Sequence, residues 1–159
     1  MLTLILSLAA TPAALSPAAE AAPGLALLDG NPDWALCAIV EGKLAAAAQN
    51  SKRLSSVVRG QDVRDLLNVS QTRCLLDANN AECLIDLTTT LKVDYVLVTD
   101  LRQLEDRILL SLRALDTSKG KARLRITREY LSEGVLLDDI PALANAVVGS
   151  LFGETTVLK

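Results

Sequence analysis

Two cysteines with eight residues between them, Cys74 and Cys83, are the residues of this 159-residue chain whose type and spacing are most suited to chemistry. The chain contains no histidine, and its third cysteine, Cys37, lies far away in the sequence. Tetrahedral zinc takes three or four cysteine or histidine ligands, so a metal site is a poor interpretation. A redox pair has more support, because Cys83 is expected in the first turn of a helix, and the thiolate of a cysteine at that position is stabilised. However, the C-x-x-C spacing of catalytic cysteine pairs is absent.

A disulfide between Cys74 and Cys83 is the interpretation that we favour. Cys74 is expected near the end of one helix and Cys83 in the first turn of the next, so a short reversal of the chain could bring their β-carbons within bonding distance. Closing such a loop stabilises a fold by roughly 3 kcal/mol in the chain-entropy model. Two reduced, packed thiols are the alternative. The distinction bears on location, since disulfides persist mainly in oxidising compartments outside the cytosol.

The other residue types do not form a catalytic set. Without histidine, Ser–His and Cys–His nucleophiles are excluded, together with the commonest general base at neutral pH. Carboxylates are paired at Glu105–Asp106 and Asp138–Asp139, but the first pair is expected in a hairpin turn and the second at a helix start, where the helix dipole favours acids. No G-x-x-x-x-G-K-[ST] phosphate loop occurs. We therefore predict a protein that is not an enzyme and needs no cofactor.

A row of cations is the surface feature with most potential for binding. Lys121, Arg123 and Arg125 alternate with apolar residues along an expected strand, so they should project from one side of it, with Arg113 nearby on the adjoining strand. Such a row could meet an acidic partner or, in a peripheral contact, the anionic headgroups of a membrane surface. The alternative is a solvated face whose charges discourage edge pairing. Nucleic acid is not an expected partner, because the net charge is -3 and only 3% of residues are aromatic.

The first 22 residues have the features of a signal peptide. An apolar run over residues 2–10 passes into an alanine-, proline- and serine-rich stretch with small-residue cleavage sites around residues 19–22. A membrane-spanning helix needs about 20 apolar residues, and Pro12 and Pro17 interrupt this run early. A short hydrophobic anchor is the alternative. We expect cleavage near Ala22 and a periplasmic or otherwise exported protein.

Residues 23–159 are expected to form a single α/β domain, a mixed α+β fold with helices packed on a sheet of about five strands. Apolar residues that alternate or run together predict strands, and a spacing of three and four predicts helices. The expected strands lie at residues 25–30, 53–58, 93–101, 107–116 and 121–131. The expected helices follow Pro32, Gln61, Asn79 and Asp139, which gives the order β-α-β-α-α-β-β-β-α.

Several local features follow from these patterns. The helix from Gln61 should run for about four turns and carry Cys74 on its apolar stripe, and the last helix should have Pro141 in its first turn. Gly120 can take the positive φ that a tight hairpin loop needs. Cys37 lies on the apolar stripe of the first helix, which predicts a packed thiol.

The runs GQDVRDLL, CLLDANNAECLIDLTTTLKVDYVLVTDL and LRALDTSKGKARLRITREY resemble the amino-terminal-domain type of TolB and the related CsgG and FlgO groups of Gram-negative bacteria. The resemblance covers about residues 25–152 and is closest to short exported members with a cysteine before L...L and another in ECL. It implies a periplasmic, non-catalytic α/β domain used in envelope assembly or protein contacts, and it supplies no catalytic residues. No β-propeller follows as in TolB, and the pore strands and lipid-anchor cysteine of CsgG are missing, which argues against translocation and secretion-channel roles.

The sequence thus predicts an exported binding or assembly module whose partner is a protein of the cell envelope. Two alternatives are kept. A thiol-redox protein would require a reduced and unusually acidic Cys83. A small-ligand carrier would require a concave apolar pocket.

Overall fold

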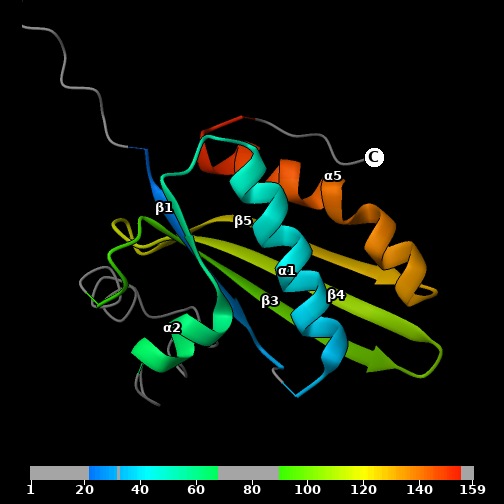
Figure 1. The fold of residues 1–159 in the computed structure, drawn as a ribbon. Helices are drawn as coiled ribbons and strands as arrows, with labels where there is room; N and C mark the ends of the chain where they lie inside the picture. Colours follow the sequence, from blue (N-terminus) through cyan, green and yellow to red (C-terminus); the bar gives the residue numbers. More distant parts are fainter. Residues whose placement is uncertain (1–21, 32, 68–89, 155–159) are drawn as a thin grey trace, which may run out of the picture.

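The computed structural model of the protein describes residues 22–31, 33–67 and 90–154. In chain order the elements are β1 (Gly24–Asp29), α1 (Ala35–Asn50), β2 (Ser56–Val58), α2 (Gly60–Leu66), β3 (Tyr95–Leu104), β4 (Arg107–Asp116), β5 (Lys121–Tyr130) and α5 (Glu133–Leu151). The strands form one sheet in the order β2-β1-β3-β4-β5 (Figure 1). β1 pairs in parallel with β2 and β3, while β3, β4 and β5 form an antiparallel meander. The predicted α/β fold with a mixed five-stranded sheet is confirmed.

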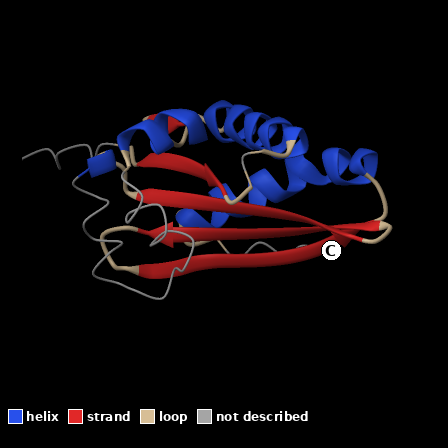
Figure 2. Cartoon of the chain, turned by 90° about the horizontal axis from the view of Figure 1, so that it is seen from below, coloured by secondary structure: helices blue, strands red, loops and turns tan. Residues whose placement is uncertain are grey.

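One face of the sheet carries α1 and α5, which contact each other along it (Figure 2). The main core lies between these helices and the strands, where Leu27, Leu97 and Leu112 meet Val40 of α1 and Leu143 of α5. All five side chains are at most 2% exposed. Each fully buried leucine contributes about 1.5–3 kcal/mol relative to an exposed one, so this layer accounts for much of the stability of the fold.

The helix α5 is long and apolar enough to cross a membrane by length and composition. However, half of that stretch is buried inside the protein, and its apolar residues at spacings of three and four face the sheet. The core position accounts for its composition.

The opposite face of the sheet has a smaller apolar cluster beneath α2. Val63 of α2 and Leu67 pack there on Ala26 of β1, Val96 of β3 and Leu115 of β4. Because successive side chains of a strand point to opposite faces, the central strands β1 and β3 are apolar on both sides, as the sequence indicated.

The predicted four-turn helix after Gln61 is wrong in its length. α2 ends at Leu66, and Leu67 has an extended backbone with φ -97° and ψ 138°. Leu66 is 55% exposed whereas Leu67 is buried, so the turn out of the helix places the second leucine, not the first, in the cluster under the sheet.

Cys74 and Cys83, the signal peptide and the helix expected at Asn79 lie outside the described residues, apart from the last helical positions at 90–91.

The predicted start of the last helix is also wrong. α5 begins at Glu133, directly after Ser132, whose hydroxyl oxygen accepts a hydrogen bond from the backbone N–H of Val135. Pro141 therefore lies inside the helix, where it is exposed and removes one backbone hydrogen bond. Ser132 followed by an acidic residue is a signal for a helix N-cap. The prediction missed this signal because Ser132 comes two residues after a strand and because Pro141 is typical of the first turn of a helix.

The two hairpins match their predictions. Glu105 and Asp106 form the tip of the β3–β4 hairpin, where Glu105 has φ 48°. Gly120 closes the β4–β5 loop with φ 59°, a backbone conformation that costs glycine nothing.

Candidate functional site

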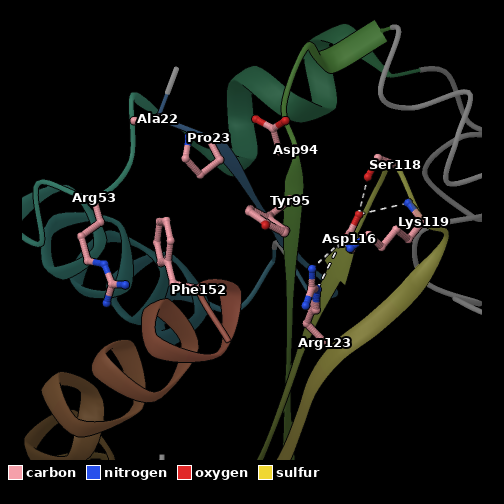
Figure 3. A pocket seen from close by; sticks show the side chains of 10 residues that line it. All are labelled: Ala22, Pro23, Arg53, Asp94, Tyr95, Asp116, Ser118, Lys119, Arg123 and Phe152. Atoms are coloured by element: carbon pink, nitrogen blue, oxygen red, sulfur yellow. Dashed lines mark hydrogen bonds and ion pairs between the residues drawn. The ribbon is translucent and has the colours of Figure 1, made fainter. Parts of the chain in front are cut away.

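A hollow of about 590 Å³ opens at the end of the sheet where β1 begins (Figure 3). Its walls come from segments far apart in the sequence: the entry to β1, the loop after α1, the start of β3, the β4–β5 hairpin and the residue after α5. The lining residues are Ala22, Pro23, Arg53, Asp94, Tyr95, Asp116, Ser118, Lys119, Arg123 and Phe152. Ligand pockets of proteins have volumes of this order, roughly 300–1,000 Å³.

Asp116, the last residue of β4, is the most buried charge in this hollow, with its side chain 4% exposed. One carboxylate oxygen accepts hydrogen bonds from the Ser118 hydroxyl at 2.7 Å and the Lys119 backbone N–H at 3.0 Å. The other accepts a hydrogen bond from Nε of Arg123 at 3.1 Å and forms an ion pair with Nη2 of the same side chain, also at 3.1 Å. Figure 3 shows these groups converging on the carboxylate. Burial alone would raise the pKa of Asp116, but the three hydrogen-bond donors and the charge of Arg123 outweigh it and lower the pKa.

The opposite wall is aromatic. The guanidinium of Arg53 lies 4.0 Å from the centre of the Phe152 ring and forms an ion pair with Glu154 at 2.8 Å. The Tyr95 hydroxyl donates to the carbonyl of Leu151 at 3.2 Å, which ties β3 to the end of α5. The hollow can therefore hold a small molecule between ring faces and fixed charges, whereas an ionised, fully bonded Asp116 is unsuited to moving a proton.

The structure divides the predicted row of cations into two groups. The pairing of β4 with β5 shifts register between Ala114 and Leu115, a β-bulge that adds one residue to β5. The regular alternation that would place all three cations of β5 on one side is interrupted there. The bulge cannot be read from the sequence, because the pattern of cations and apolar residues continues through it.

On one side of the bulge, Lys121 is opposite Asp116 in the register, and Arg123 binds the carboxylate of Asp116 and lines the hollow. On the other side, Arg125 is directly opposite Arg113 on β4. The structure thus brings Arg113 and Arg125 together and keeps Arg123 at the end of the sheet.

A second charged cluster lies where β1 ends, beside α1 and α2, around a hollow of about 430 Å³. Arg64 of α2 forms an ion pair with Asp29, and Glu41 of α1 accepts a hydrogen bond of 2.9 Å from the backbone N–H of Gly60. Burial and then the charge of Asp29 raise the pKa of Glu41, against the opposing effects of the Gly60 N–H and Arg59. These contacts anchor α2 to β1 and α1. No sequence pattern predicts these contacts, because the partners are distant in the chain and follow no common spacing.

Asp139, expected at a helix start, instead links α5 to the edge strand. Its carboxylate accepts a hydrogen bond of 2.6 Å from the Tyr130 hydroxyl and one of 2.7 Å from Arg128. Burial raises the pKa of Tyr130, and the hydrogen bond to Asp139 adds to the effect, so the phenol stays protonated. The contact is structural.

Cys37 is completely buried, as predicted, and burial, followed by the charges of Asp29 and Asp100, raises its pKa to about 11. Its thiol is therefore protonated at neutral pH and unreactive. Within the part of the chain that the structure describes, no group of three or more cysteine, aspartate and glutamate side chains is arranged to hold a metal ion.

The fold is similar to that of solved bacterial proteins. TolB from Acinetobacter baumannii has a TM-score of 0.54 and 18% sequence identity, over 84% of this chain and 29% of the TolB chain. Protein XCC0632 from Xanthomonas campestris, of the family DUF330, has a TM-score of 0.50 and 11% identity, over 84% of this chain and 87% of its own. No protein-family model and no curated protein matches the sequence. The TolB-like fold agrees with the resemblance in the sequence, while the resemblance to the CsgG and FlgO groups stays a prediction.

Proposed function

We propose that the protein is an exported, non-catalytic binding or assembly module of the bacterial cell envelope, with a protein of the envelope as its partner. The observation that carries this proposal is the fold shared with TolB of Acinetobacter baumannii, over 84% of the chain. The signal-peptide features of the first 22 residues support export to the periplasm. Since this chain spans 29% of the TolB chain, it corresponds to one part of that protein, and the role of a contact module is a proposal for this part alone.

The partner surface is proposed to include Arg113, Lys121, Arg123 and Arg125. These four residues lie on β4 and β5, and no described strand pairs with the outer edge of β5. The net charge of the whole protein is -3, so a local concentration of cations at this edge would orient an approaching acidic partner.

The test of export is the intact mass of the protein recovered from the periplasm of a Gram-negative host, measured with and without reductant. The proposal expects a mass that lacks the leader, and a further increase by a pair of hydrogen atoms on reduction if Cys74 and Cys83 are joined. Cys83→Ser should abolish that increase, whereas Cys37→Ala, which alters the buried thiol, should leave it. Recovery of the uncleaved chain in the cytosol would refute the proposed function.

A second candidate function, small-ligand binding, is favoured by the hollow of about 590 Å³ between Phe152, Tyr95 and Asp116. Native mass spectrometry of the protein purified from its own host would test this function. An additional non-covalent mass is expected, and it should be lost in Phe152→Ala but kept in Leu104→Ala, an exposed residue at the far end of the sheet. A bare polypeptide mass under these conditions would exclude a tightly held ligand.

A further inference from the structure

The outer edge of β5 is long and regular. β5 has ten residues and lies at one end of the strand order, whereas β2 at the other end has three. After the bulge, from Leu124 to Tyr130, β5 pairs with β4 without interruption. In an antiparallel pair the N–H and C=O groups of alternate residues point away from the neighbouring strand, and no strand among the described residues binds those of β5. The stretch also contains no proline, so its backbone is suited to pairing with a further strand.

The side chains of this stretch alternate between the two faces of the sheet. Ile126 is opposite Leu112, and both are buried in the core on the side of α1 and α5. The neighbours of Ile126 therefore point to the other face. Arg125, Thr127 and Glu129 lie on that face, and all three are exposed. An added strand would lie alongside this exposed row.

Two residues of the exposed row have opposite charges and are open to further contacts. Arg125 forms no ion pair or hydrogen bond with the part of the chain that the structure describes. Glu129 forms an ion pair with Arg107 at 3.0 Å through one of its two carboxylate oxygens, and both side chains are about half exposed, at 53% and 51%. Such an exposed pair contributes little to stability, so Glu129 can turn to another cation at little cost.

The stretch is complementary to itself when two copies run antiparallel. A two-fold axis perpendicular to the sheet keeps each face on its own side, so the axis must pass through one residue of β5. With the axis at Thr127, Arg125 of each copy is opposite Glu129 of the other, and the two threonines face each other. Opposite charges and paired threonines are favourable cross-strand neighbours. On the side of α5, Leu124 of each copy is opposite Tyr130 of the other.

The neighbouring registers are less favourable. An axis at Arg125 or at Arg128 would place that arginine opposite itself, and like charges directly opposite each other destabilise a sheet. An axis at Ile126 would place Arg125 opposite Thr127 and leave it without an acid. The pattern of charges therefore selects one register.

The edge is also hollowed where the second copy would contribute an apolar side chain. A hollow of about 510 Å³ lies between the end of β5 and the start of α5, and its lining residues are Arg128, Glu129, Tyr130, Val135, Asp138 and Asp139. Val135 is 53% exposed although it is apolar. With the axis at Thr127, Leu124 of the second copy is opposite Tyr130, beside this hollow, where it would shield Val135 from water.

We propose that two copies of the protein associate through the outer edges of β5, antiparallel and with the two-fold axis at Thr127, so that their sheets become continuous. Arg125 and Glu129 form the two symmetric ion pairs of this interface. The inference goes beyond the proposed function, because the partner is a second copy of the chain and not another envelope protein. Lys121 and Arg123 precede the paired stretch and stay outside it.

The test is sedimentation velocity of the processed full chain from about 1 to about 200 μM, where a monomer–dimer equilibrium is expected. Arg125→Glu and Glu129→Arg each place like charges opposite each other in both symmetric pairs, so each should weaken association by about tenfold or more. An equimolar mixture of these two variants restores opposite charges in both pairs and should associate within about threefold of wild type. Lys43→Glu, the same charge reversal on the exposed side of α1, should change association by less than about threefold.

Cross-linking tests the register. Only the residue on the axis faces its own counterpart, so Thr127→Cys should form disulfide-linked dimers on mild oxidation, beyond the background of the wild-type cysteines, whereas Arg125→Cys should not. Urea unfolding confirms that each variant is folded.

Four results would overturn the proposal: a monomer at every concentration, equal effects of Arg125→Glu and Lys43→Glu, no recovery in the mixture, or equal cross-linking at positions 125 and 127. None of them bears on the proposed function, which is tested by mass and fractionation.

Discussion

Replacing Asp116 with asparagine is expected to destabilise the protein by about 2 kcal/mol at neutral pH. Asparagine can keep its oxygen toward the Ser118 hydroxyl and the Lys119 N–H, which both bond one carboxylate oxygen of Asp116. Its amide NH₂ then faces Arg123, so the hydrogen bond from Nε and the ion pair with Nη2 are lost and donors oppose each other.

The magnitude follows from the exposure of the two partners. Hydrogen bonds to charged groups contribute about 1.5–3 kcal/mol each, and the carboxylate of Asp116 is only 4% exposed. The side chain of Arg123 is 32% exposed, so water can solvate it once the carboxylate is gone, which reduces the cost of losing the hydrogen bond and the ion pair to about 2 kcal/mol. For a domain of this length the melting temperature should fall by roughly 6–10 °C.

Urea unfolding of the processed chain measures the effect, with Asp106→Asn as the matched control. Asp106 is exposed in the turn of the other hairpin, so the same substitution there should change stability by less than about 0.5 kcal/mol. The double variant Asp116→Asn/Arg123→Met completes a mutant cycle that isolates the coupling between the two side chains.

The pH dependence provides an independent check of the same reasoning. The pKa of Asp116 is lowered in the folded protein, so its stabilising contribution is complete above its ordinary value of 3.8 and is lost as pH falls below that value through the folded pKa. The difference between wild type and Asp116→Asn should therefore persist from neutral pH to about pH 4.5 and shrink at lower pH. A variant as stable as Asp106→Asn at neutral pH would refute the argument, because water would then satisfy Arg123 as well as Asp116 does.

Three further substitutions test the contacts that anchor α2 and α5. Gly60→Ala should lower the free energy of unfolding in urea by about 1–3 kcal/mol, because the added Cβ would lie 2.5 Å from Oε2 of Glu41. Gly134→Ala is the control and should be neutral or slightly stabilising, because its nearest neighbour lies at 3.9 Å. Equal effects of the two substitutions would contradict the close approach of Gly60 to Glu41. Burial raises the pKa of Glu41, so protonation of this carboxyl favours folding: its contribution is complete below the ordinary value of 4.5 and is lost as pH rises through the folded pKa. Glu41→Gln should remove this gain on acidification, and an unchanged pH profile would show that another group causes it. Tyr130→Phe deletes the hydrogen bond of 2.6 Å to Asp139 and should lower the free energy of unfolding by about 1 kcal/mol; a melting temperature equal to that of wild type would count against the role of this bond.

The sheet could be predicted from the sequence because its signals are local. Strands of period two and a loop closed by Gly120 specify the meander, and continuous apolar runs specify the central strands. The ends of the helices depended on packing. Leu66 and Leu67 both fit a helical stripe, and only the cluster beneath the sheet decides which of them is buried. The start of α5 at Glu133 did have a local signal in Ser132, which Pro141 obscured.

The charged sites were less predictable because they combine distant residues. Asp29 and Arg64 are joined only when α2 lies against β1, and no periodicity relates them. Asp116 was more accessible to sequence reasoning, since an aspartate that opens a four-residue turn commonly accepts hydrogen bonds from the next residues. The sequence did not indicate that Arg123 would donate a hydrogen bond to the same carboxylate.

The bulge between Ala114 and Leu115 explains why cations that are neighbours in the sequence have different roles. A regular strand would place Arg123 and Arg125 on one face with similar exposure and similar tasks. The extra residue turns Arg123 to Asp116, where its charge stabilises the hairpin, and leaves Arg125 opposite Arg113 in the register of the two strands. One residue of register thus separates two neighbouring cations, so loss of the charge at Arg123 is expected to weaken the hairpin, whereas loss of the charge at Arg125 leaves the contact with Asp116 intact.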